Sequence, residues 1–143
     1  MQNKLPIVNV ATVCEKILRE TDNVASLIRV IDVFHLPQEA VQLQPEGSIP
    51  VSALIVVRGG DYRGEGEIAV SVHTPDGKQQ DFPEKWPMLF SDAVPANSLV
   101  LNFGMAFKHV GTSWIDVLWN GELLTKFPIT LALQSAALPA PTA

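Results

Sequence analysis

The stretch Asn97-Ser-Leu-Val-Leu-Asn-Phe-Gly-Met-Ala-Phe-Lys108 decides the fold class, because apolar residues occupy every second position of its central part. Successive side chains of a strand point to opposite faces, so a period of two is typical of a strand with one buried face. The residues expected on that face are Leu99, Leu101, Phe103, Met105 and Phe107. We therefore expect a long β-strand here.

The same alternation recurs along the chain and predicts an all-β protein. Residues 65–74 divide into two sets, with Ile68, Val70 and Val72 inside and Glu67, Ser71 and His73 outside. Residues 24–34 and 51–57 are β-branched runs, and alternate residues of 123–133 form another apolar face. Turn-forming residues such as Pro75-Asp-Gly77 separate these runs. The pattern predicts an antiparallel β-sandwich, immunoglobulin-like or jelly-roll-like, with about eight strands.

Residues 10–20 fit two structures. Val10, Val13, Cys14, Ile17 and Leu18 follow the spacing of an amphipathic helix. However, residues 7–13 are rich in β-branched side chains, and Thr21-Asp-Asn23 can turn the chain directly into the run at 24–34. We favour the strand, as half of a long hairpin. Opposite charges would then face each other across the hairpin, namely Glu15, Arg19, Arg29 and Asp32.

Length, charge and cysteine content limit the classes of function. A chain of 143 residues suits one domain, which we assign to residues 1–134, with a disordered tail at 135–143. The formal charge of -5 argues against partners such as nucleic acid or an anionic membrane. Cys14 is the only cysteine, which favours a reducing compartment, and we expect the protein in the cytoplasm. No export signal or membrane span is visible in the sequence.

Two proline-containing loops flank the central strands. Residues 37–50 are mainly polar and are expected to form an ordinary connection. Residues 83–97 carry Trp86, Met88 and Phe90, and we expect this loop to fold its apolar side chains over one end of the sandwich as a lid.

Trp114 and Trp119 lie on a predicted strand that ends in an Asn-Gly turn. They are five residues apart, so a regular strand directs them to opposite faces and excludes a shared platform. A two-residue loop, Asn120-Gly121, would bury Asp116 unless a polar group satisfies it. A three-residue loop, Trp119-Asn-Gly121, would bury Ile115 and Val117 with Leu123 and Thr125. We favour the three-residue loop, which leaves both tryptophans partly exposed and places Asp116, Leu118, Leu124 and Lys126 outside.

No pattern in the sequence indicates catalysis, a cofactor or a metal. His35, His73 and His109 lack the spacing of a shared ligand face, and we expect them to be solvated near strand ends. The loop carboxylates are too dispersed for a calcium site. Cys14 has apolar neighbours, which raise the pKa of a thiol and make it inert. The glycines of residues 58–66 do not follow a phosphate-binding fingerprint, and a hairpin loop is expected there.

The chain resembles a family of small uncharacterised bacterial proteins, which form a domain of unknown function. The residues that carry the resemblance are Ala11-Thr-Val-Cys-Glu-Lys-Ile-Leu18, Ser26-Leu-Ile-Arg-Val-Ile-Asp-Val-Phe34, and Gly111, Trp114, Val117, Asn120-Gly-Glu-Leu-Leu and Pro128-Ile129. The resemblance covers nearly all of the chain except its tail. It implies a β-sandwich, and it implies no activity, catalytic residue or cofactor.

These observations favour a non-enzymatic protein-interaction or oligomerisation module, whose partner is another protein or a second copy of the chain. The surface expected to carry the interaction comprises Trp114, Asp116, Leu118, Trp119, Lys126, Tyr62 and Trp86. The alternative is a carbohydrate-binding β-sandwich module that uses its loop aromatics, Trp119 with Trp86 or Tyr62. The sequence identifies no small-molecule ligand.

Overall fold

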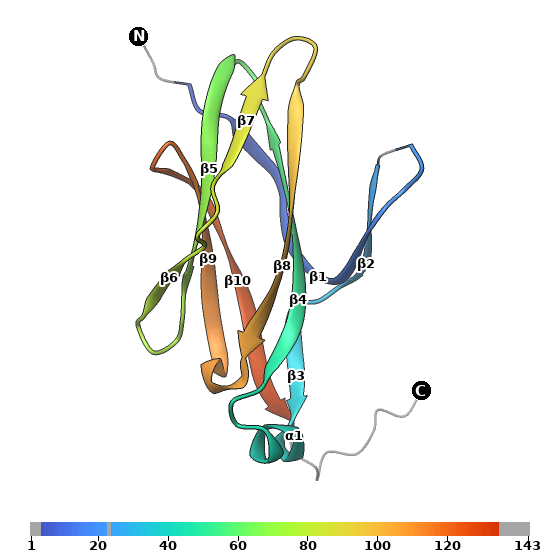
Figure 1. The fold of residues 1–143 in the computed structure, drawn as a ribbon, viewed down its shortest axis with the longest axis vertical. Coiled ribbons are helices and arrows are strands. Elements are labelled where there is room, and N and C mark those ends of the chain that lie inside the picture. Colours follow the sequence, from blue (N-terminus) through green and yellow to red (C-terminus); the bar gives the residue numbers. More distant parts are fainter. Residues whose placement is uncertain (1–3, 23, 135–143) are drawn as a thin grey trace.

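The computed structural model describes residues 4–22 and 24–134 and has an all-β sandwich fold (Figure 1). Its elements are β1 (Ile7–Arg19), β2 (Ala25–Val30), β3 (Val33–Pro37), α1 (Gln38–Leu43), β4 (Ser48–Arg58), β5 (Gly64–His73), β6 (Gln79–Asp81), β7 (Trp86–Phe90), β8 (Ala96–Ala106), the 3₁₀ turn η1 (Phe107–His109), β9 (Gly111–Trp119) and β10 (Glu122–Gln134). The predicted tail at 135–143 lies outside the described residues.

The strands form two sheets. One has four strands in the order β2-β1-β4-β8. The other has the order β3-β10-β9-β5-β6, with β7 also paired to β5. Neighbouring strands are antiparallel except β3, which pairs parallel with β10. β3 follows β2 directly along the chain but belongs to the opposite sheet.

The described residues form ten strands rather than about eight, for two reasons. The run at 24–34 is not one strand, since the chain leaves the first sheet after Val30 and enters the second at Val33. The expected lid at 83–97 is also wrong. Residues 86–90 form β7, and this strand pairs with β5 from Gly64↔Phe90 to Ile68↔Trp86.

The inner faces of both sheets meet in one apolar core. Leu99, Leu101 and Met105 of β8 are buried in it, as the alternation predicted, although Phe107 lies beyond the strand in η1. Ile68, Val70 and Val72 of β5 are buried as predicted. Sheet-on-sheet burial of this kind supplies the main stabilisation of a sandwich.

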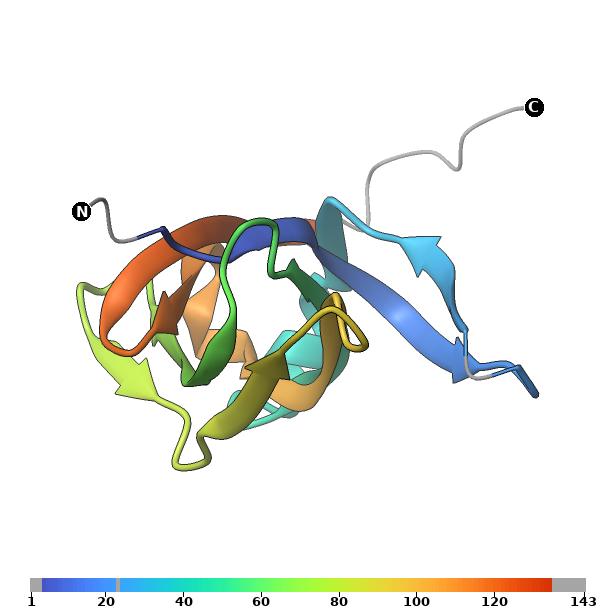
Figure 2. The ribbon, with the colours of Figure 1, turned by 90° about the horizontal axis from the view of Figure 1, so that it is seen from above.

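Residues 10–19 are strand, as favoured over helix, but the two halves of β1 have different neighbours. Its first half pairs with β4 as far as Cys14↔Ser52, and its second half pairs with β2 alone, from Cys14↔Val30 to Arg19↔Ala25. Seen from above, β1 and β2 therefore leave the sandwich as a projecting hairpin (Figure 2). We call residues 15–22 and 24–30 the β1–β2 arm. Among the described residues, no helix reaches the length and apolarity that a membrane crossing requires.

Candidate interaction surfaces

The β9–β10 hairpin has a two-residue loop followed by a bulge, not the three-residue loop we favoured. Trp119 pairs with Glu122 across Asn120-Gly121, and the register shifts between Leu123 and Thr125. Both loop residues have positive φ, 48° for Asn120 and 88° for Gly121, as a type I′ turn requires. After the extra residue of the bulge, Thr125 pairs with Val117 and Phe127 with Ile115, whereas the three-residue loop would have paired Leu123 with Val117 and Thr125 with Ile115.

The bulge explains how a short loop avoids burying Asp116. Ile115 and Val117 are fully buried, whereas Asp116, Leu118 and Lys126 lie on the outer face. Those face assignments were correct. Two leucines have the opposite placement to the one we expected. Leu123, expected inside, is half-exposed, and Leu124, expected outside, packs against the core.

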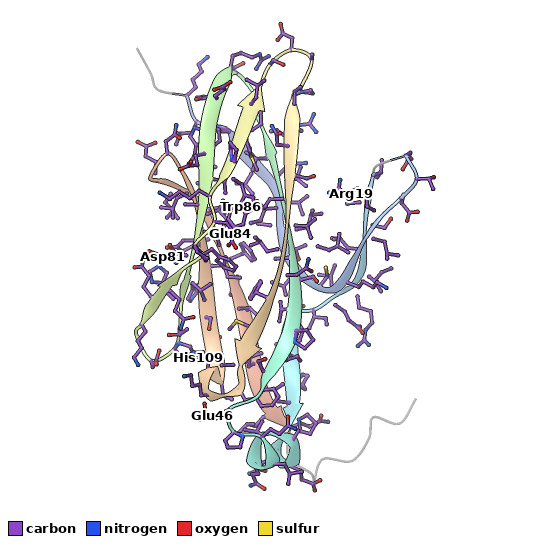
Figure 3. The ribbon with its side chains drawn as sticks, in the orientation of Figure 1. Arg19, Glu46, Asp81, Glu84, Trp86 and His109 are labelled. Carbon is purple, nitrogen blue, oxygen red and sulfur yellow. The ribbon has the colours of Figure 1, made fainter. Side chains whose placement is uncertain are left out.

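Trp119 is not at an exposed tip, as we expected, but is 2% exposed in the core. The ring of Tyr62 packs edge-on against it at 5.4 Å, and the ring of Phe90 lies 5.6 Å away. Trp86 is half-buried on β7, with its ring centroid 6.2 Å from that of Phe82 (Figure 3). These aromatic faces therefore pack inside the sandwich, and the structure does not bring Trp119, Tyr62 and Trp86 together as an exposed platform.

An open cleft of about 470 Å³ does lie beside the Tyr62 ring. Its wall contains Trp119, Tyr62 and Asn120, and its rim carries the ion pair of Lys4 Nζ with Asp61 Oδ2 at 3.2 Å. The cleft is mainly polar, because its lining also includes Arg63 and Glu122.

Trp114 lies on the outer face of the six-stranded sheet and is 41% exposed. The Nζ atom of Lys126 stands 5.2 Å from the centre of its ring, within the range of a cation–π contact. On the next strand, His73 Nε2 lies 2.8 Å from Asp116 Oδ2. The indole thus lies between His73 on one side and Pro128 on the other, with Lys126 over its ring.

The outer face also holds a serine, a histidine and an aspartate, but they do not form a catalytic relay. Ser71 Oγ donates to Asp81 Oδ1 at 2.7 Å, whereas His73 contacts Asp116. Within the described ranges, Ser71 and His73 share no hydrogen bond. Ser71 was expected outside but is only 6% exposed, because Asp81 of the neighbouring edge strand lies against it. A nucleophile needs access for its substrate, and this buried hydroxyl is not accessible.

The three histidines occupy different parts of the molecule. His35 is exposed on β3, and His73 is half-buried on β5. His109 was expected to be solvated but is 8% exposed, since η1 folds it against the end of the sandwich (Figure 3). Among residues 4–22 and 24–134, no three His, Cys, Asp or Glu side chains lie close enough to hold a metal ion.

The β1–β2 arm exposes several apolar side chains, and the sequence analysis expected this hairpin but not its exposure. Leu18, Val24, Ile28 and Val30 are 38–58% exposed on it. Ile17 and Leu27 lie opposite each other on the other face and are half-exposed. The adjacent apolar pairs Ile17-Leu18 and Leu27-Ile28 were the available signal, because a strand covered on one face alone needs only alternate apolar residues.

A cleft of about 400 Å³ opens where the arm joins the sandwich. Its apolar lining comes from the β2–β3 connection, β3 and the start of β4, namely Ile31, Val33, Phe34, Ile49 and Pro50. At its rim, Arg29 Nη1 pairs with Glu15 Oε2 at 3.2 Å across the two strands of the arm. This pair confirms one of the cross-strand contacts expected from the sequence. The arm and the cleft together form a continuous candidate surface.

Comparison with known proteins bears on the fold alone. No protein-family model and no curated protein matches the sequence. The fold is similar to part of the alkylpurine DNA glycosylase AlkC of Pseudomonas fluorescens, solved bound to DNA containing an abasic site analog. The TM-score is 0.55 and the identity 12%, over 88% of this chain and 30% of that one. An immunoglobulin-like protein of Pseudomonas aeruginosa aligns with a TM-score of 0.39 and 10% identity, over 90% and 97% of the two chains.

This chain spans less than a third of the glycosylase's length, and at 12% identity the likeness says nothing about activity. The two facing sheets and their shared core identify the protein as a β-sandwich.

Proposed function

We propose that the protein is a non-enzymatic protein-interaction module, and that the β1–β2 arm and the cleft at its base are its binding surface. One observation carries the proposal. The arm exposes Leu18, Ile28 and Val30, while β2 pairs with no strand except β1 among those described. A two-stranded hairpin is marginally stable in water, so an arm of this kind gains stability when a partner covers it.

The chemistry of the surface favours a protein partner with an apolar face. Contiguous exposed apolar residues with a polar rim mark protein interaction sites. Here the ion pair of Glu15 with Arg29 stands at the rim. A cytoplasmic location belongs to the same proposal, supported by the single, buried thiol of Cys14.

The carbohydrate-binding alternative has less support. Trp114 is the one tryptophan with substantial exposure among the described residues, and its ring lies under Lys126. An array of glycans would test this alternative, and binding that disappears with Trp114→Ala would favour it over the arm.

The main experiment is affinity capture from the native host followed by mass spectrometry, with the full chain as bait. Ile28→Asp places a carboxylate on the exposed face of the arm and is expected to remove the partner. The matched control is Leu43→Asp, since Leu43 is 82% exposed on α1, away from the arm. A protein captured equally by the wild type and both variants would contradict binding through the arm.

A further inference from the structure

β8 is an edge strand of the four-stranded sheet. It pairs with β4 over its whole length, from Ser48↔Ala106 to Arg58↔Ala96, with no shift of register. Among the described residues, no strand pairs with its other side. Alternate residues of this eleven-residue strand therefore direct their backbone N–H and C=O groups outward, and near its start Asn97 Nδ2 donates to the Leu89 carbonyl of β7 at 2.9 Å.

This edge lacks the features that normally prevent a further strand from adding to a sheet. Charged residues, prolines, bulges and short length are the usual protections. β6 has only three residues, β3 and β7 have five residues each and contain Pro37 and Pro87, and β2 has Arg29 at a positive φ of 54°. β8, Ala-Asn-Ser-Leu-Val-Leu-Asn-Phe-Gly-Met-Ala, has no charge, no proline and no bulge. Its edge is therefore the one best suited to strand addition among those described.

We infer that the β8 edge pairs with the β8 edge of a second copy, antiparallel about a two-fold axis at Leu101. In this register, Leu101 lies opposite Leu101 of the second copy and Ala96 lies opposite the partner's Ala106. The two strands therefore pair over their whole length without an overhang. Leu99 then lies beside the partner's Phe103, and Val100 beside the partner's Asn102. The two four-stranded sheets become one continuous sheet, and each copy satisfies the edge of the other.

Charge at the ends of β8 selects a second copy as the occupant. Lys108 follows the strand, and Asp92 precedes it, with its side chain 94% exposed and its Oδ1 atom accepting from Arg63 Nε at 2.9 Å. In the antiparallel register, Lys108 of one copy falls opposite Val94 of the partner subunit, two residues from the partner's Asp92, and symmetry repeats the contact at the other end. The second oxygen of each Asp92 would then accept from Lys108 of the other copy, so that opposite charges meet at both ends of an uncharged seam, although each chain carries a formal charge of -5.

A cavity beside the β8 edge could accept side chains of an added strand. A cavity of about 370 Å³ runs along the second half of β8, and its lining includes Phe82, Phe103, Met105 and His109. It lies on the side of β8 that faces the other sheet. The inward side chains of an added strand, such as the partner's Leu99 beside Phe103, would enter this space.

Sedimentation velocity and light scattering of the full chain test the inference. The wild type is expected to dimerise with rising concentration, and Asn102→Lys is expected to weaken dimerisation at least about tenfold, because a lysine on an edge strand opposes pairing. Asn102 is exposed, and circular dichroism checks that the variant folds. Thr112→Lys, a change on the other sheet, is the matched control and should dimerise like the wild type.

A mixing experiment tests the register. The carboxylate introduced by Val100→Glu in one copy would lie opposite the ammonium introduced by Asn102→Lys in the other. The mixture of the two variants should therefore form heterodimers more strongly than either variant alone forms homodimers. A monomeric wild type, or a mixture that stays monomeric, would overturn the inference. The arm variant Ile28→Asp should dimerise normally, so failure of this inference and failure of the proposed arm function are separate results.

Discussion

Gly66 of β5 lies directly against the indole of Trp119, so that a Cβ atom built on Gly66 would stand 2.0 Å from Cζ2 of the ring. Since real Cβ contacts are not that short, Gly66→Ala must displace the largest fully buried side chain of the core. Overpacking of this kind costs about 1–3 kcal/mol or more. We expect urea unfolding to show at least this loss.

The control for Gly66→Ala is Gly77→Ala, where nothing lies within 4 Å of the added Cβ and only the positive φ of 82° opposes the side chain. Its cost should be about 1–2 kcal/mol. Trp119→Leu should reduce the additional penalty of Gly66→Ala in a double-mutant cycle. Equal costs for Gly66→Ala in the two backgrounds would contradict a clash with the indole.

The two tryptophans of the hairpin should differ sharply in their contribution to stability. Trp119→Ala removes a buried side chain and should cost about 3–5 kcal/mol. Trp114→Ala removes a half-exposed ring with a cation–π contact to Lys126, worth about 0.5–1 kcal/mol at an exposed site. Urea titrations of both variants measure the difference. Similar losses would mean that Trp114 is part of the core.

The turn at Asn120 combines a backbone conformation with a bridge to β5. Asn120 Oδ1 accepts from the N–H of Glu67, and its own N–H donates to the Glu67 carbonyl, both at 3.0 Å. Asn120→Ala loses the side-chain bond and disfavours positive φ, and should cost about 1–3 kcal/mol. Asn120→Gly keeps the backbone conformation and should cost less. Chemical unfolding of both variants separates the two contributions, and a more damaging glycine would exclude a conformational role.

The sequence predicted the fold best where one face of a strand is buried and the other is not. In β8 and β5 the alternation identified the inner residues, and in β9 the separation of Trp114 and Trp119 by an odd number of residues placed them on opposite faces. These results depend only on the period of a strand, which is a local property of the chain.

Features that depend on a neighbouring strand escaped prediction. The bulge at Leu124 shifts β10 relative to β9, and no local pattern distinguishes it from a longer loop. β7 was not expected as a strand because it contains Pro87, and this proline is tolerated because β7 is an edge strand.

The hairpin of β1 and β2 was expected, but its projection from the sandwich was missed, because the sequence of β1 does not reveal that β4 stops pairing at Cys14. Of the expected interaction surface, Trp114, Asp116, Leu118 and Lys126 lie on one outer face, while Trp119 is in the core.

Cys14 should report on opening of the arm. The residue is buried where β1 leaves the sandwich, as the sequence predicted, and this burial raises the pKa of its thiol, although Sγ also donates weakly to the Lys16 carbonyl. Little thiolate is therefore present near neutral pH. The folded protein should react with a thiol reagent at least about 100-fold more slowly than the unfolded chain. Absorbance with and without denaturant measures both rates, and similar rates would show that the site opens readily.

Asp81 should make the stability of the sandwich edge depend on pH. The hydrogen bonds that its carboxylate accepts from Gln79 and from Ser71 lower the pKa of Asp81. A folded-state pKa below the unfolded value, about 3.9, means that the carboxylate stabilises the protein fully above that value and loses the effect as pH falls through the folded pKa. The wild type should therefore lose more stability than Asp81→Asn when the pH is lowered.

The measurement is the free energy of unfolding of wild type and Asp81→Asn at about pH 6 and about pH 3. The gap between the two proteins should narrow at the lower pH, because protonation removes from the wild type the charge that the variant already lacks. Ser71→Ala, which removes one donor, should show a smaller narrowing of its own gap. Glu39→Gln on α1 is the charge-matched control. A gap for Asp81→Asn that is the same at both pH values would mean that its hydrogen bonds hold the neutral carboxyl as well as the charged one, contrary to the lowered pKa.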